Sequence, residues 1–297
     1  MGTEPRINGV KNALSIDLED WFCVHNLAQA IKRDDWDKCD LRVRANTTRI
    51  LDLLDRHNVR ATFFILGWVA DRAPDLIREV EARGHEIGVH GYNHLLLTEI
   101  TPEEFDEDLG KALEAIAKTG IKSQPIGFRA PSFSMVNATK GWALPILEKY
   151  GFQYDSSVFP IRHDRYGIPG SPRYPHVIET PAGPIREFPI ATVKLSNDRV
   201  APIGGGGYLR LLPYRYTSAG IRRLNRDENQ PACIYFHPWE IDPDQPRLAS
   251  GLIARLRTYT GVKGMTGKLE RLLAEFEFST LTHVCGEAER SATVIAQ

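Results

Sequence analysis

The sequence lacks the features of several protein classes. Its four cysteines are scattered and form no Cys-x-x-Cys pair, which argues against a disulfide framework or a structural zinc site and favours a reducing compartment. It contains no apolar run of about eighteen residues, so we expect no transmembrane helix. Its 37 basic and 38 acidic side chains leave a formal net charge of -1, which gives no reason to expect nucleic acid or an anionic membrane as the main partner.

Two further signals are also absent. Residues 1–11 are polar and lack the apolar core of a secretory signal, so we expect a cytoplasmic protein. The glycines at 204–207 are followed by Tyr-Leu-Arg rather than by the Lys-Ser or Lys-Thr of a phosphate-binding loop. We interpret this glycine run as a flexible loop.

Short apolar runs alternate with longer amphipathic stretches, which is typical of parallel βα units. Strand-like runs lie at 12–16, 61–66, 86–90, 127–129, 151–155, 185–189 and 232–236, and helical patterns at 44–57, 74–83, 101–119, 142–150 and 266–276. The segment 157–207 is rich in proline and glycine and is expected to form long loops. Because no domain boundary interrupts the series, we expect one domain over residues 1–297, with a core at about 12–285, folded as an incomplete parallel barrel.

Polar residues follow several strand-like runs directly. They are Asp17, Glu19 and Asp20 after the first run, His90 and His94 after the third, and Arg129, Asp155 and His237 after later ones. In a parallel barrel the carboxyl ends of the strands converge on one face, where active sites are built. We therefore expect these side chains to meet.

The two histidines are the first candidates for metal binding. Their four-residue spacing would place both imidazoles on one face of a helical turn, from which they could bind one divalent cation. A carboxylate from residues 17–20 would complete a site of two histidines and one acid, and a second carboxylate would serve as general base. The ordinary alternatives are a histidine pair without metal and acids that cap a helix.

Three later residues have two interpretations each. Arg129 would hold a carboxylate by paired hydrogen bonds or form a surface ion pair. His237 would be a core residue or a proton donor in a cleft, and Asp155 would raise the basicity of an imidazole or cap a turn. The whole set favours a metal-dependent hydrolase.

Together these motifs resemble the polysaccharide deacetylases of the NodB-homology type, one of the carbohydrate esterase families. The five stretches that carry the resemblance are 15–20, 90–94, 128–131, 154–156 and 235–237, in the order of the family's five motifs. The stretch 237–248 is further similar to the branch found near exopolysaccharide gene clusters. The resemblance implies a distorted, seven-stranded βα barrel.

The resemblance also implies a role for each residue. Asp17 would be the general base and Arg129 would steady it. His90 and His94 would bind the metal, and Asp155 would tune the acid, His237.

The first motif departs from the family pattern, because Asp17-Leu18-Glu19-Asp20 replaces the usual Asp-Asp-Gly. Side chains alternate along an extended segment, so Asp17 and Glu19 would face one side while Leu18 and Asp20 face the other. We therefore expect Glu19 to be the acidic metal ligand. A chain that turned helical at once would instead put Asp17 and Asp20 on one face.

The resulting hypothesis is a metal-dependent deacetylase that hydrolyses the acetamide of an N-acetylated sugar in a polysaccharide or a lipid-linked glycan precursor. It would hold one divalent ion, with zinc expected, and its partner would be a carbohydrate. Two alternatives remain open. One is a hydrolase of another C–N amide or an acetyl ester on the same barrel, and the other is a carbohydrate-binding pseudoenzyme without metal.

Overall fold

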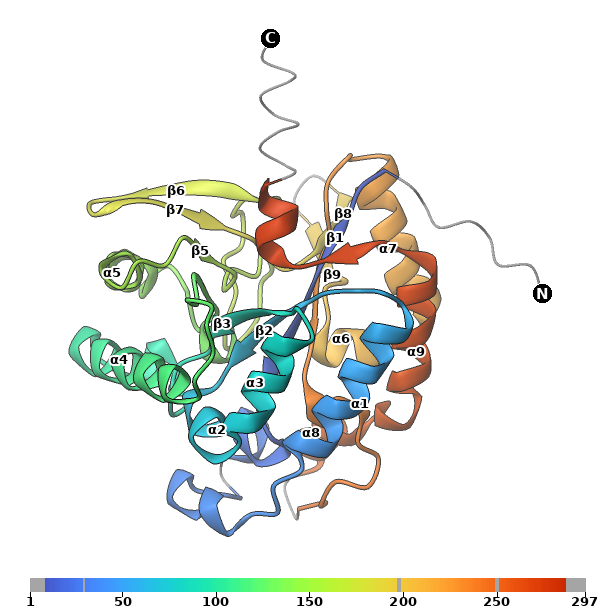
Figure 1. The fold of residues 1–297 in the computed structure, drawn as a ribbon. Helices are drawn as coiled ribbons and strands as arrows, with labels where there is room; N and C mark the ends of the chain where they lie inside the picture. The colour runs from blue at the N-terminus through green and yellow to red at the C-terminus, as the bar shows by residue number, and fades with distance from the viewer. Residues whose placement is uncertain (1–8, 29, 197–198, 249–250, 287–297) are drawn as a thin grey trace.

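The computed structural model describes residues 9–286, except 29, 197–198 and 249–250. Within these residues a nine-stranded sheet has the order β10-β1-β2-β3-β4-β5-β7-β6, and β11 also pairs with β1 (Figure 1). Its strands are β1 (Asn12–Leu18), β2 (Thr62–Ile65), β3 (Glu86–Val89), β4 (Gly127–Phe128), β5 (Tyr154–Asp155), β6 (His176–Thr180), β7 (Gly183–Glu187), β10 (Cys233–Phe236) and β11 (Phe278–Ser279). All neighbours pair in parallel except β6 and β7.

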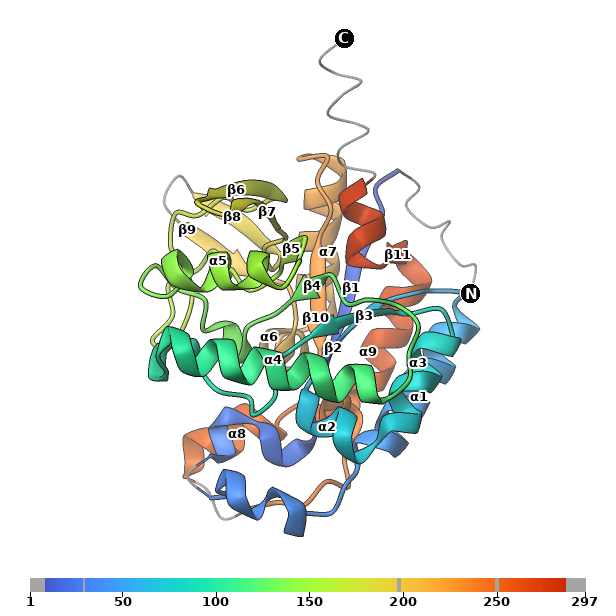
Figure 2. The same cartoon turned by 60° about the vertical axis from the view of Figure 1, so that its left-hand side comes forward.

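Helices lie around the outside of this sheet, with α1, α3 and α9 on one side and α4 and α5 on another (Figures 1 and 2). They are α1 (Val43–Arg56), α2 (Gly67–Arg72), α3 (Pro74–Ala82), α4 (Pro102–Lys118), α5 (Lys140–Lys149), α6 (Gly206–Leu211), α7 (Tyr214–Arg226), α8 (Leu252–Tyr259) and α9 (Val262–Glu275). None of the helices in the described part of the chain combines the length and the apolar character needed to cross a membrane.

Local sequence signals explain where several elements begin and end. Thr101 and Glu104 form a capping box at the start of α4, in which each side chain accepts a hydrogen bond from the other's backbone N–H. Gly84 follows α3 with a φ of +80°, a conformation that glycine adopts without strain. The strand β1 is buried along its whole length, as expected for a parallel strand covered on both faces.

The segment 157–207 differs from the expected long loops. It contains two antiparallel hairpins, β6 with β7 and β8 (Thr192–Ser196) with β9 (Arg199–Pro202). The side chains of β6 alternate between exposed and half-buried, so this strand lacks the continuous apolar run that identified the others.

The prediction of a flexible glycine loop at 204–207 is wrong. Gly205 has a φ of +134°, and a Cβ atom there would lie 1.8 Å from the carbonyl oxygen of Tyr235. The backbone N–H of Tyr235 donates to the carbonyl of Gly204 at 2.7 Å. These glycines are therefore present because the chain packs directly on β10.

The mostly parallel α/β sheet is confirmed. After β7 the chain returns to the other end of the strand series, where the Ala191 N–H donates to the carbonyl of Cys233 at 3.1 Å. The seven-stranded barrel stays a prediction, as does the single domain over residues 1–297. The first eight and last eleven residues of that range, with most of the polar N-terminal stretch, lie outside the described residues.

Candidate metal and catalytic site

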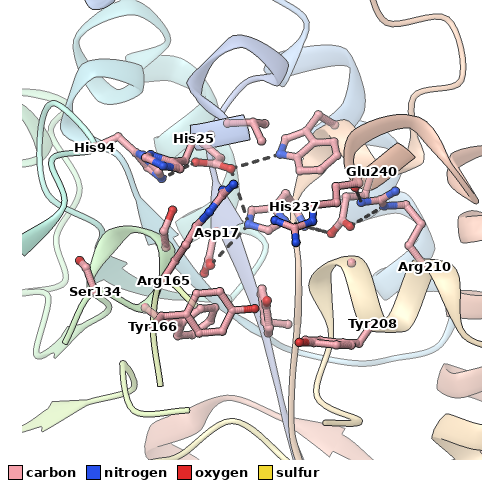
Figure 3. A pocket seen from close by; sticks show the side chains of 18 of the residues that line it. Asp17, His25, His94, Ser134, Arg165, Tyr166, Tyr208, Arg210, His237 and Glu240 are labelled. Atoms are coloured by element: carbon pink, nitrogen blue, oxygen red, sulfur yellow. Dashed lines mark hydrogen bonds and ion pairs between the residues drawn. The ribbon is translucent and has the colours of Figure 1, made fainter. Parts of the chain in front are cut away.

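A pocket of about 370 Å³ lies where β1, β3 and β10 end (Figure 3). Five of the residues predicted from the sequence line it: Asp17, Glu19, His90, His94 and His237. Asp17 is the second-last residue of β1, and His90 and His237 directly follow β3 and β10. The carboxyl ends of parallel strands thus bring together residues that lie more than 200 positions apart in the chain.

Glu19, His90 and His94 form a possible metal-binding group. One ligand atom of each lies within 4.8 Å of the other two, and no other such group of three occurs in the described residues. Glu19 Oε2 and His94 Nε2 are 2.9 Å apart, a contact that is favourable only when a proton or a cation is shared between them. Two imidazoles and one carboxylate are a donor set that zinc takes in sites with open positions.

The ionisation of these groups also fits a cation. The Nδ1 atom of His90 lies 2.8 Å from the carbonyl oxygen of Arg129, which assigns the ring proton to Nδ1 and leaves Nε2 for a ligand bond. Burial lowers the pKa of His90 to about 4, so its ring is neutral, as a ligand must be. Burial alone would raise the pKa of Glu19, but the charges of His94 and His237 outweigh it and lower that pKa to about 2.

The expected helical turn at 90–94 is wrong. Gly91 and His94 have φ values of +70° and +57°, so the segment is an irregular loop. The carboxylate of Asp108 in α4 holds this loop, because it accepts hydrogen bonds from the backbone N–H groups of Tyr92 and Asn93 at 2.7 and 3.0 Å. Left-handed residues directly after the strand prevent a helix, and sequence reasoning missed the part played by Asp108.

The first motif follows the alternation expected of an extended segment. Leu18 is fully buried in the core, and Glu19 points into the pocket with Asp17. The carboxylate of Asp20 instead accepts hydrogen bonds from the backbone N–H groups of Trp21, Arg42 and Val43, at 2.7 to 2.8 Å. Asp20 therefore caps the turn at Trp21–Cys23, and the assignment of Glu19 as the metal ligand stays a prediction that this geometry supports.

Asp17, the candidate base, is held by a buried arginine. Its Oδ1 accepts a hydrogen bond from Arg129 Nη1 at 2.7 Å. The remaining guanidinium N–H groups donate to the Ser15 hydroxyl and to the hydroxyl and carbonyl oxygens of Ser156. Burial alone would lower the pKa of Arg129, but the charge of Asp17 outweighs burial and raises the pKa of Arg129 above its usual value. The arginine therefore fixes one carboxylate oxygen of Asp17.

His237, the candidate acid, lies among three carboxylates. Its Nδ1 is 3.0 Å from Glu240 Oε2, and its Nε2 is 3.5 Å from Glu19 Oε1 and 3.8 Å from Asp17 Oδ2. Burial would lower the pKa of His237, but Glu19, Glu240 and Asp17 together raise it to about 9. The ring of Trp239 stacks on this imidazole and its Nε1–H donates to Glu19 Oε1 at 3.1 Å.

The predicted partner of His237 was Asp155, and the structure corrects this assignment. Asp155 lies opposite Glu187 in the β5–β7 register and accepts a hydrogen bond from the Ser157 hydroxyl. Glu240 takes the Nδ1 hydrogen bond instead, because the turn after β10 returns it to His237. A catalytic role for Asp155 stays a prediction.

Sequence reasoning missed several residues of the pocket. Glu240 is three residues after His237 and forms a capping box with it, a spacing that could have been recognised. Others come from segments that were interpreted as loops or left unassigned, and they include His25, His163, Arg165, Tyr166, Tyr208, Arg210 and Arg257.

Two family models match the chain. Residues 34–154 match the model described as polysaccharide deacetylase, and residues 156–286 match a domain of unknown function, DUF3473. The first range contains His90, His94 and Arg129, the second contains His237, and Glu19 precedes both. The pocket is therefore assembled from both matched ranges and the segment before them.

Curated relatives match part of the chain. A peptidoglycan-N-acetylglucosamine deacetylase from Bacillus cereus is 39% identical over 70 residues, which are 24% of this chain and 26% of that protein. A chitooligosaccharide deacetylase from Bradyrhizobium is 36% identical over 85 residues, 29% of this chain and 39% of that protein. The matches cover between 26% and 39% of these relatives' own length.

Two solved structures share the fold over nearly the whole chain. One, described as a polysaccharide deacetylase from Mycobacterium smegmatis, has a TM-score of 0.62 at 20% identity and covers 98% of this chain and 95% of its own. Another, from Pseudomonas aeruginosa PAO1, has a TM-score of 0.62 at 15% identity and covers 95% and 91%. Residues 34–154 therefore form a polysaccharide deacetylase domain of the NodB-homology type, and residues 156–286 match DUF3473.

Proposed function

We propose that this chain is a metal-dependent deacetylase that hydrolyses the acetamide of an N-acetylated sugar in a polysaccharide or a lipid-linked glycan precursor. The observation that carries the proposal is the position of the Glu19, His90 and His94 group beside both Asp17 and His237 in one pocket. The names of the relatives from Bacillus cereus and Bradyrhizobium support this substrate class.

Glu19, His90 and His94 would hold one divalent ion, and the donor set favours zinc. Such an ion, when bound, polarises the amide carbonyl and lowers the pKa of water at the site. His90 is already neutral and Glu19 is already ionised near neutral pH, because their pKa values are about 4 and about 2. These two ligands therefore do not have to release a proton when the ion binds.

The protein's own residues would then move two protons. Asp17, held by Arg129, accepts the proton of the attacking water as its oxygen bonds to the carbonyl carbon. His237 donates a proton to the nitrogen as the C–N bond breaks, so that acetate and a free amine leave. Without that proton the amine would be a very poor leaving group. Glu240 orients the imidazole, and Glu19, Glu240 and Asp17 together favour its protonated form.

Metal content and acetate release test the proposal directly. The purified protein should contain one divalent ion per chain and release acetate from N-acetylated oligosaccharides. His90→Ala and His94→Ala should lose metal and activity together, whereas His176→Ala, in β6 and outside the pocket lining, should retain both. If the variant lacking both His90 and His94 kept its metal, the metal site would be wrong.

The two alternative functions predict other results of the same measurements. Bound metal, with release of acetate from aryl or alkyl acetates only, would favour an esterase. Absence of metal under conditions that load the site, combined with binding of glycans, would favour a pseudoenzyme.

A further inference from the structure

One wall of the pocket is rich in basic and aromatic side chains. It consists of His163, Arg165 and Tyr166 from the segment between β5 and β6, Tyr208 from α6 and Arg257 from α8. We call these five residues the basic wall. All of them lie in the range that matches the domain of unknown function, whereas the residues that would hold the metal do not.

The carboxylates that line the pocket are already engaged elsewhere. Asp17 pairs with Arg129 at 2.7 Å and Glu240 pairs with Arg210 at 2.8 Å. Glu19 contacts His94 at 2.9 Å and would bind the ion. The guanidinium groups of Arg165 and Arg257 line the same pocket and add positive charge to it.

The field of these two arginines reaches the neighbouring histidines. Burial lowers the pKa of His25, and among the nearby charges Arg165 lowers it further while Glu99 acts against it. Burial also lowers the pKa of His163, where Asp164 opposes the effects of Arg257 and Arg165. Asp164 is largely exposed and is not among the residues that line the pocket. The wall is thus a place where an anion would be stabilised.

Aromatic stacking fixes the shape of the wall. Tyr166 stacks on His163, with ring centroids 3.9 Å apart and planes at 16°, and on Phe159, at 5.9 Å and 11°. In Figure 3 Tyr166 and Tyr208 lie along one side of the pocket while the Arg165 side chain extends into it. A stack of this kind limits the movement of the 163–166 segment and offers flat apolar rings against which a sugar can pack.

We infer that the basic wall is a subsite for an acidic group on the substrate, a carboxylate or a phosphate, carried next to the N-acetylated sugar. The inference rests on the proposed deacetylase function and adds a substrate class to it. Guanidinium groups bind both kinds of anion through paired, charge-assisted hydrogen bonds. The wall selects an acidic glycan over a neutral one of the same size.

Matched substrates test this inference. One pair is an oligosaccharide of alternating N-acetylglucosamine and glucuronic acid and its neutral methyl ester, and a second pair is an N-acetylglucosamine oligosaccharide with and without a phosphate monoester. In at least one pair the acidic member should have a kcat/KM about tenfold higher or more, the size expected of a charge-assisted contact. The pairs also show whether the carboxylate or the phosphate is recognised.

Arginine variants identify the residues responsible. Arg165→Gln and Arg257→Gln should each reduce the acidic-to-neutral ratio, and the double variant should bring it close to one. Arg162→Gln is the matched control, since Arg162 is exposed on the same segment and does not line the pocket, and it should keep the ratio of the unmodified protein. A ratio of one or less in both pairs, or a preference that survives in the double variant, would overturn the inference.

Equilibrium binding of the same pairs separates this inference from the proposed function. Tighter binding of the acidic member that is lost in the double variant supports the subsite, even if no acetate is released and the deacetylase proposal fails. Acetate release with equal affinity and equal turnover for both members would leave the deacetylase standing and refute the subsite.

Discussion

The Nδ1 atom of His237 lies 3.0 Å from Oε2 of Glu240, a fully buried carboxylate that also binds Arg210. The turn at Pro238–Ile241 returns Glu240 to the end of β10, so its Oε2 accepts hydrogen bonds from both the ring and the backbone N–H of His237. The other ring nitrogen, Nε2, faces Glu19 and Asp17. The imidazole is therefore oriented by a residue from its own turn, and Glu19, Glu240 and Asp17 together favour its protonated form.

We predict that Glu240→Gln lowers deacetylation of an N-acetylated oligosaccharide by on the order of 10²-fold, because a glutamine neither stabilises nor orients the protonated ring as a carboxylate does. Hydrolysis of 4-nitrophenyl acetate, whose leaving group needs no proton, should fall much less. Parallel kinetics on the two substrates measure the difference.

Asp155→Asn serves as the comparison for this variant. It should affect both substrates to a similar extent, because Asp155 packs with Glu187 and Ser157 rather than with His237. A selective loss of amide hydrolysis in Asp155→Asn, with little change in Glu240→Gln, would return the tuning role to Asp155.

Metal content should distinguish variants of the neighbouring acids Glu19 and Asp20. Glu19→Gln is expected to lose bound metal, since Glu19 is the carboxylate within reach of His90 and His94. Asp20→Asn should keep the metal but lower the free energy of unfolding by about 1 kcal/mol, because an amide has only one oxygen to accept the three backbone hydrogen bonds that the carboxylate accepts with two. Metal analysis and urea unfolding check both. Loss of metal in Asp20→Asn with retention in Glu19→Gln would reverse the assignment.

The parts of this site that local periodicity controls could be predicted from the sequence. Buried parallel strands such as β1 and β10 appear as continuous apolar runs, and polar residues directly after them must lie at one edge of the sheet. The alternation that separates Glu19 from Asp20 follows from the extended backbone alone. These rules suffice to bring Asp17 and His237 into one pocket.

The parts that long-range packing controls could not be predicted in this way. The left-handed conformation of His94 depends on a loop that Asp108 holds from α4. The partner of His237 depends on a short turn rather than on the strand series that suggested Asp155. The basic wall comes from a region whose hairpins have no continuous apolar run, so its residues gave no periodic signal.

Asp17→Asn should leave metal bound and nearly abolish turnover, because an amide cannot accept the proton of the attacking water. The loss is expected to be on the order of 10²-fold or more. Ser15→Ala is the matched control, since it removes another acceptor of Arg129 on the same strand without touching the carboxylate. Its loss of activity should be far smaller. Normal turnover in Asp17→Asn would exclude this residue as the base.

The pair of Asp155 and Glu187 should make stability depend on pH. Both carboxyls are fully buried and adjacent. Burial raises the pKa of Asp155 from 3.8 to about 6, and burial together with Asp155 raises that of Glu187 well above 4.5. Between these pKa values the native state binds more protons than the unfolded state, so the free energy of unfolding falls as the pH rises. The stability that the pair contributes is complete below pH 3.8 and is lost as the pH rises through about 6 and beyond.

Replacing one acid of this pair should reduce the loss of stability that occurs as the pH rises. We expect the free energy of unfolding of Glu187→Gln, relative to the unmodified protein, to increase between about pH 5 and pH 8, because the amide needs no proton to remain buried beside Asp155. Urea unfolding at several pH values measures this difference. Glu179→Gln, at an exposed position in β6, should change stability by an amount that does not depend on pH. A difference for Glu187→Gln that stayed constant over this range would show that the two carboxyls do not share a proton in the native state.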